Sequence, residues 1–251
     1  MSGSKRAHSG WMALSVAMVI STAVAAFAWQ YVKTKPAVRT LKVTGSAKKQ
    51  IVADEIGWSA EIVTHHMDRT SAYRSLHAHV ETTLAYLRGE GLTDDEIRVS
   101  AADVREDFEN RYFGTGEERV RKRVFLGYTT RQSITIRSGR VELVERLSRE
   151  VTQLLEKGVP VSSSQPAYYY TKLGELKIEM LAAASRDARI RAENIVAQAG
   201  EAELGKLKYV DMGVINVNPV NSTATSWQGN MDTTSLEKDI ITVVHAKFEL
   251  N

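Results

Sequence analysis

The sequence contains no cysteine. This absence excludes disulfide bonds, a thiol nucleophile and cysteine-ligated zinc or iron–sulfur sites. Hydrophobic residues make up 43% of the chain and charged residues 25%, which are ordinary values for a folded domain and exclude wholesale disorder. About 210 residues after the N-terminal segment are enough for one domain, or for two small lobes, with a real hydrophobic core.

The first forty residues have no acidic side chain. They carry five basic ones: Lys5, Arg6, Lys33, Lys35 and Arg39. Without these five, residues 41–251 hold 28 basic and 30 acidic side chains, so the net charge of +3 for the whole chain becomes −2 for its body. A near-neutral body lacks the clustered basic surface that nucleic-acid binding requires. We therefore expect no nucleic-acid partner.

An uncharged run follows the tail 1–10 and covers residues 11–32. As a helix it is about 33 Å long, which is roughly the thickness of a bilayer core. Trp11 lies at one end, and Trp29 and Tyr31 lie at the other, where interfacial aromatic residues are enriched. The run predicts a transmembrane anchor, followed by a linker at 33–40 and an ectodomain at 41–251.

A cleaved signal peptide is the alternative to this anchor. Lys5 and Arg6 suit its basic start, and residues 26–28 (AFA) suit a cleavage site near Ala28. Signal sequences have apolar regions of about 7–15 residues, so the length of the run favours the anchor. Both interpretations place the body outside the cytoplasm, either on the inner membrane as a single-pass protein or soluble in the periplasm.

The body lacks the common catalytic signatures. It has no nucleophile elbow, no P-loop, no H-E-x-x-H and no dinucleotide-binding glycine motif after a strand. His65 and His66 are neighbours on a predicted strand and point to opposite faces, while His77 and His79 are two apart on a predicted helix. Neither pair can chelate one ion. We expect no enzyme activity, no cofactor and no metal site.

Apolar periodicity predicts ten elements in the body. Alternating residues predict strands, repeats of three and four predict helices, and glycines at 89, 158 and 200 end those helices. The expected strands are 41–44, 51–64, 97–104, 124–137, 159–170, 208–217 and 240–250, and the expected helices are 68–88, 138–157 and 173–199. Gly45-Ser46 is expected to break the first strand, residues 105–123 to form a charged connection, and Asn218 to Asp239 to form a mobile loop.

The order of these elements predicts an α+β fold with an antiparallel or mixed sheet. The middle of the chain reads strand-helix-strand-strand-helix-strand, which is the split βαβ arrangement of ferredoxin-like folds. A doubly wound fold needs regular alternation of strands and helices instead. The third helix of the body is the longest, and its contact face is rich in alanine, so another backbone can approach it closely.

Exposed aromatic side chains and an alanine-rich helix face are the two kinds of candidate for an oligomer interface. Tyrosine is enriched at interfaces, and Tyr168, Tyr169 and Tyr170 form an unusual run. Trp227 lies in a polar loop and is the best candidate for an exposed aromatic side chain. The alanine face of the third helix is the other candidate, and its central members are Ala184, Ala188 and Ala192.

The body resembles the SIMPL-domain family, a domain of unknown function that includes oxidative-stress defence and periplasmic immunogenic proteins. The resemblance covers residues 41–251 and rests on six segments in family order. They are 43–49 (VTGSAKK), 127–133 (GYTTRQS), 168–173 (YYYTKL), 187–193 (DARIRAE), 204–206 (LGK) and 248–250 (FEL). It implies an exported or membrane-anchored protein that forms homo-oligomers and has a loose association with envelope or oxidative stress. It supplies no catalytic residues.

The sequence thus favours a non-enzymatic, membrane-anchored, extracytoplasmic protein that assembles with itself. A scaffold that binds a small ligand or an envelope protein is the alternative. An unrecognised hydrolase is the least favoured interpretation, since no nucleophile and base are recognisable.

Overall fold

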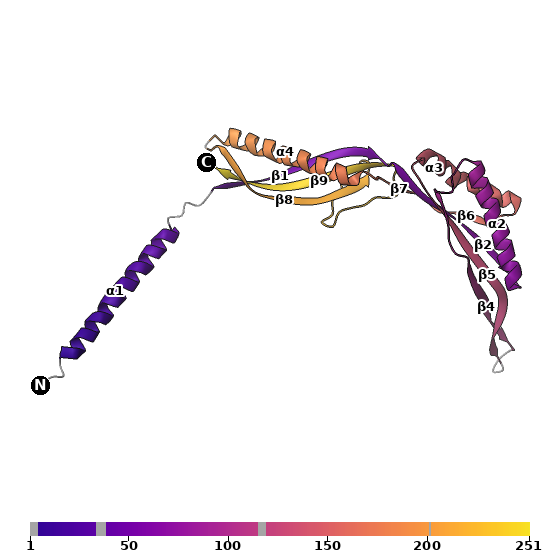
Figure 1. Cartoon of the computed structure of the whole chain (residues 1–251), viewed down its shortest axis with the longest axis horizontal. Coiled ribbons are helices and arrows are strands. Elements are labelled where there is room, and N and C mark those ends of the chain that lie inside the picture. Colours follow the sequence, from indigo (N-terminus) through magenta and orange to yellow (C-terminus); the bar gives the residue numbers. More distant parts are fainter. Residues whose placement is uncertain (1–4, 34–38, 115–118, 201) are drawn as a thin grey trace. The chain divides into compact units, whose positions relative to one another are not determined.

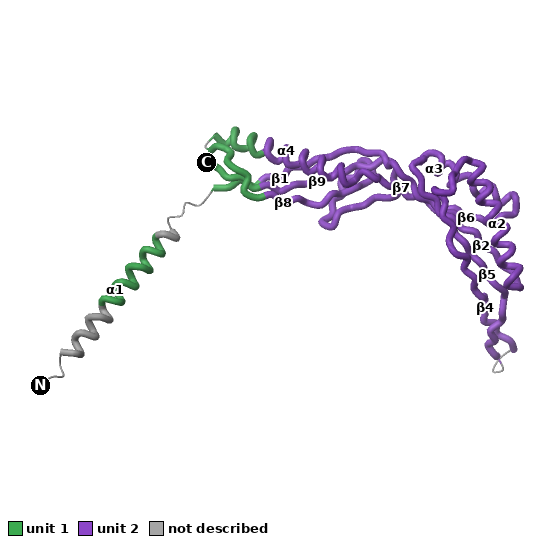
Figure 2. The backbone as a smooth tube through the Cα atoms, viewed as in Figure 1, with its two compact units in different colours: residues 1–42, 192–209, 247–251 green, residues 43–191, 210–246 purple. Residues whose placement is uncertain are grey.

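A computed structural model describes residues 5–33, 39–114, 119–200 and 202–251. The chain divides into two compact units: the first comprises Met1–Lys42, Ala192–Tyr209 and Lys247–Asn251, and the second comprises Val43–Arg191 and Val210–Ala246 (Figure 2). The elements in chain order (Figure 1) are α1 (Lys5–Lys33), β1 (Thr40–Val52), β2 (Glu55–His66), α2 (Arg69–Gly89), β3 (Ile97–Val99), β4 (Asp103–Phe113), β5 (Val120–Ser138), α3 (Val141–Glu150), the 3-10 helix η2 (Val151–Lys157), β6 (Val161–Ser163), β7 (Ala167–Tyr169), α4 (Leu173–Ala199), β8 (Leu204–Pro219) and β9 (Glu237–Leu250).

The strands form two sheets. One has three strands in the order β1-β9-β8, and the other has six, with the path β3-β5-β2-β6, β4 paired to β5 and β7 paired to β2. Each pairing within the six-stranded sheet is antiparallel. The α+β class and the antiparallel sheets are therefore confirmed.

The six-stranded sheet has a split topology. The helix α2 connects β2 to β3, yet β5 lies between these two strands in the sheet. The strand order agrees with the split arrangement expected for the middle of the chain. Residues Ile56, Trp58, Ala60 and Ile62 alternate along β2 and are fully or nearly fully buried, together with Ile134 and Ile136 of β5. They form one core with α2 and α3, which lie on the same side of the sheet (Figure 1).

The predicted helices α2 and α4 are confirmed. Asp68 caps α2 by accepting a 2.8 Å hydrogen bond from the backbone N–H of Ser71. The apolar repeat that predicted this helix consists of Tyr73, Leu76, Val80, Leu84 and Leu87; its four aliphatic members are buried, whereas Tyr73 is exposed. The second predicted helix consists of α3 followed by η2, and it ends at Gly158, whose φ of 77° is left-handed.

The expected strand break at Gly45-Ser46 is wrong. The strand β1 runs through both residues, and the interruption falls at Ala53 and Asp54, before β2. Gly45 has a different role, because a Cβ there would lie 2.1 Å from the carbonyl oxygen of Ala184 and 2.7 Å from the Cβ of Ala188. The glycine therefore lets β1 and α4 pack backbone against backbone.

Two further boundaries differ from the prediction. The charged connection at 105–123 is mostly strand, since β4 pairs with β5 from Asp103 to Phe113. Most side chains of β4 are exposed on both of its faces and many are charged, so the sequence shows no apolar alternation that would predict a strand. The single strand expected at 159–170 is two short strands, β6 and β7, which pair with different parts of β2.

The N-terminal helix α1 has 29 residues. The described side chains of this helix, at 16–30, are exposed, and Trp29 is among them. The side chains of Trp11 and Tyr31 lie outside the described residues, as does most of the predicted linker. Within the part of the chain that the structure describes, no helix is long and apolar enough to cross a membrane.

Candidate interaction surface

The alanine face of α4 is used inside the protein. Ala184, Ala188 and Ala192 are each fully buried. Ala184 and Ala188 lie directly on Gly45 of β1, and Asp187 between them accepts a 2.7 Å hydrogen bond from the backbone N–H of Ser46. The prediction that these alanines form an oligomer interface is wrong, because all three are fully buried within the chain, where Ala184 and Ala188 meet β1.

The three consecutive tyrosines have three different environments. Tyr168 packs against the core of the six-stranded sheet, and burial raises the pKa of its hydroxyl. Tyr170 packs on the apolar cluster beneath α4. Tyr169 is exposed, and its ring lies over Gly57 and 5.5 Å from the guanidinium carbon of Arg137. Of the three, Tyr169 is the exposed one, and Tyr168 and Tyr170 are half-buried.

Trp227 is 94% exposed and is the most exposed large aromatic side chain of the described residues. Side-chain hydrogen bonds hold its loop, residues 220–236, to β8. The side-chain oxygen of Asn216 accepts hydrogen bonds from the backbone N–H groups of Ser226 at 2.9 Å and Asn230 at 3.1 Å. Asn216 is itself buried. The expected loop is present between β8 and β9, and the side chain of Asn216 holds it to β8; its mobility stays a prediction.

A buried ion pair fastens the other end of this loop. Lys238 of β9 is 1% exposed and donates from its Nζ to the backbone oxygen of Asp232 at 2.7 Å. Burial raises the pKa of Asp232, but hydrogen bonds from Thr234 and Ser235 and the charge of Lys238 outweigh it and hold the pKa at about 2. The loop that carries Trp227 is thus held at both ends.

An apolar area lies beside Trp227 on the face of the three-stranded sheet that α4 leaves uncovered. Val210, Met212 and Val214 alternate along β8 and are 39%, 63% and 39% exposed. A depression of about 200 Å³ links this row to the loop, and Val214, Trp227, Val243 and His245 line it. We call Val210, Met212, Val214, Trp227 and Val243 the β8 surface.

The β8 surface continues onto a free sheet edge. In the described residues β8 pairs with β9 on one side only, apart from a single bridge between Val217 and Met231. Asp211 is the one charged residue between Tyr209 and Val217. Lys206 and Lys208 lie near the start of β8, and no lysine follows them before its end at Pro219, whereas the opposite edge strand, β1, carries Lys42, Lys48 and Lys49. Lysines on an edge oppose pairing with another strand, and an apolar edge without them favours it.

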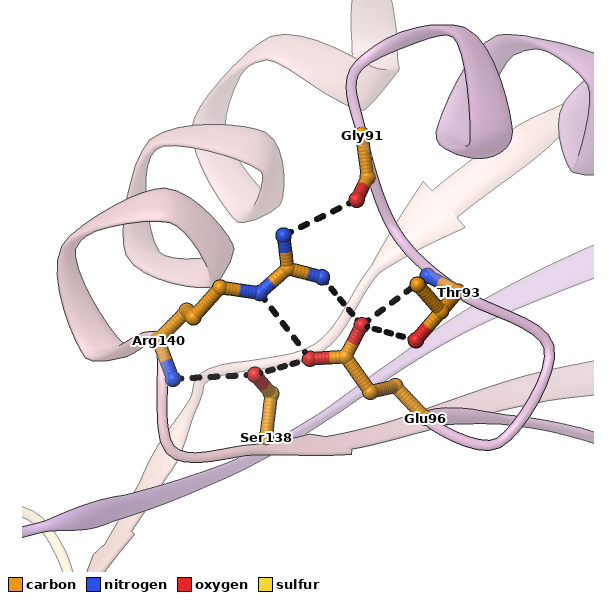
Figure 3. Close-up of polar contacts among 5 residues, drawn as sticks. All are labelled: Gly91, Thr93, Glu96, Ser138 and Arg140. Carbon is orange, nitrogen blue, oxygen red and sulfur yellow. Dashed lines mark hydrogen bonds and ion pairs between the residues drawn. The ribbon is translucent and has the colours of Figure 1, made fainter.

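The acidic cluster at 94–96 has a structural role. Glu96 accepts hydrogen bonds from the backbone N–H and hydroxyl of Thr93, from Ser138 and from Arg140 (Figure 3). Arg140 also donates to the backbone oxygen of Gly91 at 2.9 Å. The Arg140 hydrogen bond is the main cause that lowers the pKa of Glu96 to about 2. A carboxylate so strongly ionised is poorly matched to proton transfer near neutrality, and the cluster ties the α2–β3 turn to the start of α3.

The histidines do not converge on one point. The Nδ1 of His66 accepts a hydrogen bond from the backbone N–H of Asp68, and the ring of His77 stacks on Tyr73. His65 lies 3.8 Å from the carboxylate of Asp107. Among the residues that the structure describes, no group of three or more histidine or acidic side chains is arranged to hold a metal ion.

Sequence reasoning did not identify Val210, Met212 and Val214. The strand itself was expected at 208–217, but a strand pattern does not tell which strand lies at an edge or which face a helix covers. The scarcity of charge from Tyr209 to Val217 was the available signal.

Together these features define an α+β protein with two antiparallel sheets and an apolar, partly unpaired edge. The chain belongs to the SIMPL family, whose family model matches residues 41–248 and is described as a protein of unknown function (DUF541). No curated protein matches the chain.

Proposed function

We propose that this protein is a non-enzymatic, membrane-anchored, extracytoplasmic protein that assembles into a homo-oligomer through the β8 surface. One observation carries the proposal: an apolar sheet face, an unpaired strand edge and a fully projecting tryptophan are continuous with one another. Exposed apolar surface of this kind marks sites of protein association.

The energies favour the use of several of these side chains together. Full burial of one large apolar side chain contributes roughly 1.5–3 kcal/mol. Association costs at least about 4 kcal/mol in lost translational and rotational freedom. Burial of Trp227 alone is therefore insufficient, whereas burial of the exposed parts of Trp227, Met212 and the two valines in one contact reaches the lower end of this cost. Pairing of the β8 edge adds backbone hydrogen bonds.

The membrane anchor and the location rest on the sequence. Residues 11–32 have no charged side chain, and basic residues flank the run on both sides. We place the protein at the inner membrane with the body in the periplasm or outside the cell, and a soluble form cleaved near Ala28 is the alternative. The link to envelope or oxidative stress rests on the family resemblance alone.

The experiment that tests assembly measures the mass of the full chain in mild detergent by light scattering. The wild-type protein is expected to be an oligomer at micromolar concentration. The double variant Met212→Lys with Val214→Lys places two charges on the β8 surface and is expected to be a monomer. Val52→Lys is the matched control, because Val52 is an exposed apolar residue on the opposite edge strand, β1. A wild-type monomer, or an oligomer that tolerates both lysines, contradicts the proposal.

A binding scaffold is the second candidate, and a groove that shares Val214 with the β8 surface supports it. Leu173, Lys177 and Leu181 of α4 face Ile215 and Val217 of β8 across a volume of about 410 Å³. A ligand held there raises the melting temperature by mass action. Thermal melts of the full chain against envelope lipids, peptidoglycan fragments and divalent metals test this function. Leu181→Trp fills the groove and is expected to abolish any shift.

A further inference from the structure

Three of the five phenylalanines of the chain lie in the hairpin formed by β4 and β5. They are Phe108, Phe113 and Phe125, and the first two are exposed. Phenylalanine normally belongs to the core, yet this hairpin leaves it on a projecting ribbon. We call described residues 108–114 and 119–125 the hairpin arm.

The strand register sorts the side chains of the hairpin arm onto two sides. Phe108 lies opposite Phe125, Asn110 opposite Arg123, and Tyr112 opposite Arg121. Residues directly opposite in an antiparallel pair share one face. Arg119 is two residues from Arg121 and lies on the same face. This aromatic–arginine face therefore holds Phe108, Tyr112, Phe125, Arg119, Arg121 and Arg123, with Asn110 between them.

Two of the three arginines of this face, Arg119 and Arg123, are stacked on its rings. The guanidinium carbon of Arg123 lies 3.7 Å from the ring centre of Phe108, and that of Arg119 lies 4.4 Å from the ring centre of Tyr112. A stacked guanidinium keeps its N–H donors at its edge, where they are free to bind phosphate or carboxylate oxygens. The stacking thus orders the cations without neutralising them.

No described acidic side chain of the hairpin arm lies on this face, and Glu106, two residues before Phe108 on β4, is the nearest one on the same side of the strand. The one acidic residue of the hairpin arm is Glu109, which lies on the other side and pairs with Arg111 at 2.7 Å. Glu117 and Glu118 are outside the described residues. None of Arg119, Arg121 and Arg123 forms an ion pair with a carboxylate of the described chain. The face combines three cations with three aromatic rings.

We propose that the aromatic–arginine face of the hairpin arm docks on the phosphate-bearing surface of an anionic lipid bilayer. Arginines are attracted to anionic headgroups, and aromatic side chains are enriched at the depth of those headgroups. Binding of single-stranded nucleic acid needs free ring faces on which bases stack, but arginines already cover the rings of Phe108 and Tyr112. The face is separate from the β8 surface, so this inference does not depend on self-assembly.

The test uses the cysteine-free chain as a background for a single label. Asn110→Cys places one polarity-sensitive dye on the aromatic–arginine face of the full chain, which is held in phosphatidylcholine nanodiscs. Vesicles of phosphatidylcholine and phosphatidylglycerol in equal amounts are then added, and pure phosphatidylcholine vesicles serve as the neutral arm. Anionic vesicles are expected to raise and blue-shift the dye emission, with an affinity that falls as salt rises, and neutral vesicles to leave it unchanged.

Two sets of variants distinguish the effect of the arginines on this face from the effect of the net charge of the protein. Each arginine near an anionic surface contributes about 5-fold to binding, so the triple variant Arg119→Gln, Arg121→Gln and Arg123→Gln is expected to lose on the order of 100-fold. The matched control Arg69→Gln, Arg74→Gln and Arg98→Gln removes the same charge from exposed sites elsewhere and is expected to bind like wild type. An unchanged melting temperature shows that each variant is folded.

Three outcomes overturn the proposal. The first is equal loss in the hairpin and control variants, which indicates net charge alone. The second is a dye response to inorganic polyphosphate, single-stranded DNA or an acidic peptide that equals the response to anionic vesicles. The third is that the dye on the folded protein, with all three arginines present, does not respond to anionic vesicles.

Discussion

Each of the two sheets has one face that no helix covers, and the centres of these two faces differ in the side chains that they carry. On the six-stranded sheet, Glu61 of β2 and Arg131 of β5 form an ion pair, and Ser59 and Ser133 lie beside them. On the three-stranded sheet, the corresponding face presents the β8 surface, and a Lys208–Glu249 ion pair lies further towards the start of β8. The polar side chains of the first face are suited to contact with water, whereas the second face exposes valine, methionine and tryptophan.

In both sheets, successive side chains along a strand alternate between the face that a helix covers and the uncovered face, but the residues on the uncovered face differ. Along β2, every second residue enters the core, and the residues between are polar, which is the normal pattern of a half-solvated antiparallel sheet. Along β8, Ile215 and Val217 contact the cluster beneath α4, yet the alternate residues Val210, Met212 and Val214 are also apolar. Apolar residues on both faces are typical of a strand with a covering on both sides. We propose that a second copy of the chain covers the uncovered face of β8.

The largest effect expected from this comparison is on the buried side of the six-stranded sheet. Ile134 is fully buried, and Ile134→Ala is expected to lower the free energy of unfolding by about 2–5 kcal/mol because it opens a cavity. Met212→Ala removes a similar volume from the uncovered face and is expected to leave the stability of the monomer unchanged. Urea unfolding of the full chain in detergent, followed by the fluorescence of buried Trp58, measures both. A large loss for Met212→Ala in a monomeric sample shows that β8 is covered within one chain.

The next effect concerns the packing of α4 on the three-stranded sheet. Gly45→Ala places a Cβ 2.1 Å from the backbone oxygen of Ala184 and is expected to cost about 1–3 kcal/mol or more through overpacking. Gly174→Ala is the control, since no atom lies within 4 Å of its added Cβ. Alanine is the better helix former, so this control is expected to gain up to about 1 kcal/mol. Equal stability of the two variants excludes the close contact between β1 and α4.

A smaller, pH-dependent effect belongs to Glu96 beside the six-stranded sheet. Its pKa is about 2 in the folded protein and has an ordinary value of 4.5. Because the folded value is the lower one, ionised Glu96 stabilises the fold above pH 4.5, and this contribution is lost as the pH falls from 4.5 towards 2. Glu96→Gln is expected to be less stable than wild type at pH 6 and to approach it at pH 3. A stability difference that stays constant between these two pH values contradicts the assigned role.

Much of the fold follows from the sequence. The helix repeats from Leu76 to Leu87 and from Leu176 to Ala192 depend on local spacing, and the alternation of Ile56, Trp58 and Ala60 does too. These patterns predicted α2, α4 and β2 because each element buries one face, and periodicity records which face that is.

The remaining features depend on contacts between distant segments. Gly45 reads locally as a break, and only the approach of α4, some 140 residues later in the sequence, turns it into a packing site. The alanine face of α4 was correctly expected to meet a close neighbour, but the sequence does not tell whether that neighbour is the same chain. The asparagines of β8 that fasten the Trp227 loop likewise have partners that no local pattern reveals.

Cross-linking at single cysteines compares the two edges of the three-stranded sheet most directly. Val210→Cys, Met212→Cys and Val214→Cys place one thiol on β8, and Val52→Cys places one on β1, in a chain that has no other cysteine. With a short thiol-reactive cross-linker and the full chain in detergent, at least one β8 variant is expected to give a covalent dimer in high yield, while Val52→Cys stays monomeric on a denaturing gel. Monomers from all three β8 variants, or a dimer from Val52→Cys alone, contradict assembly through the β8 surface.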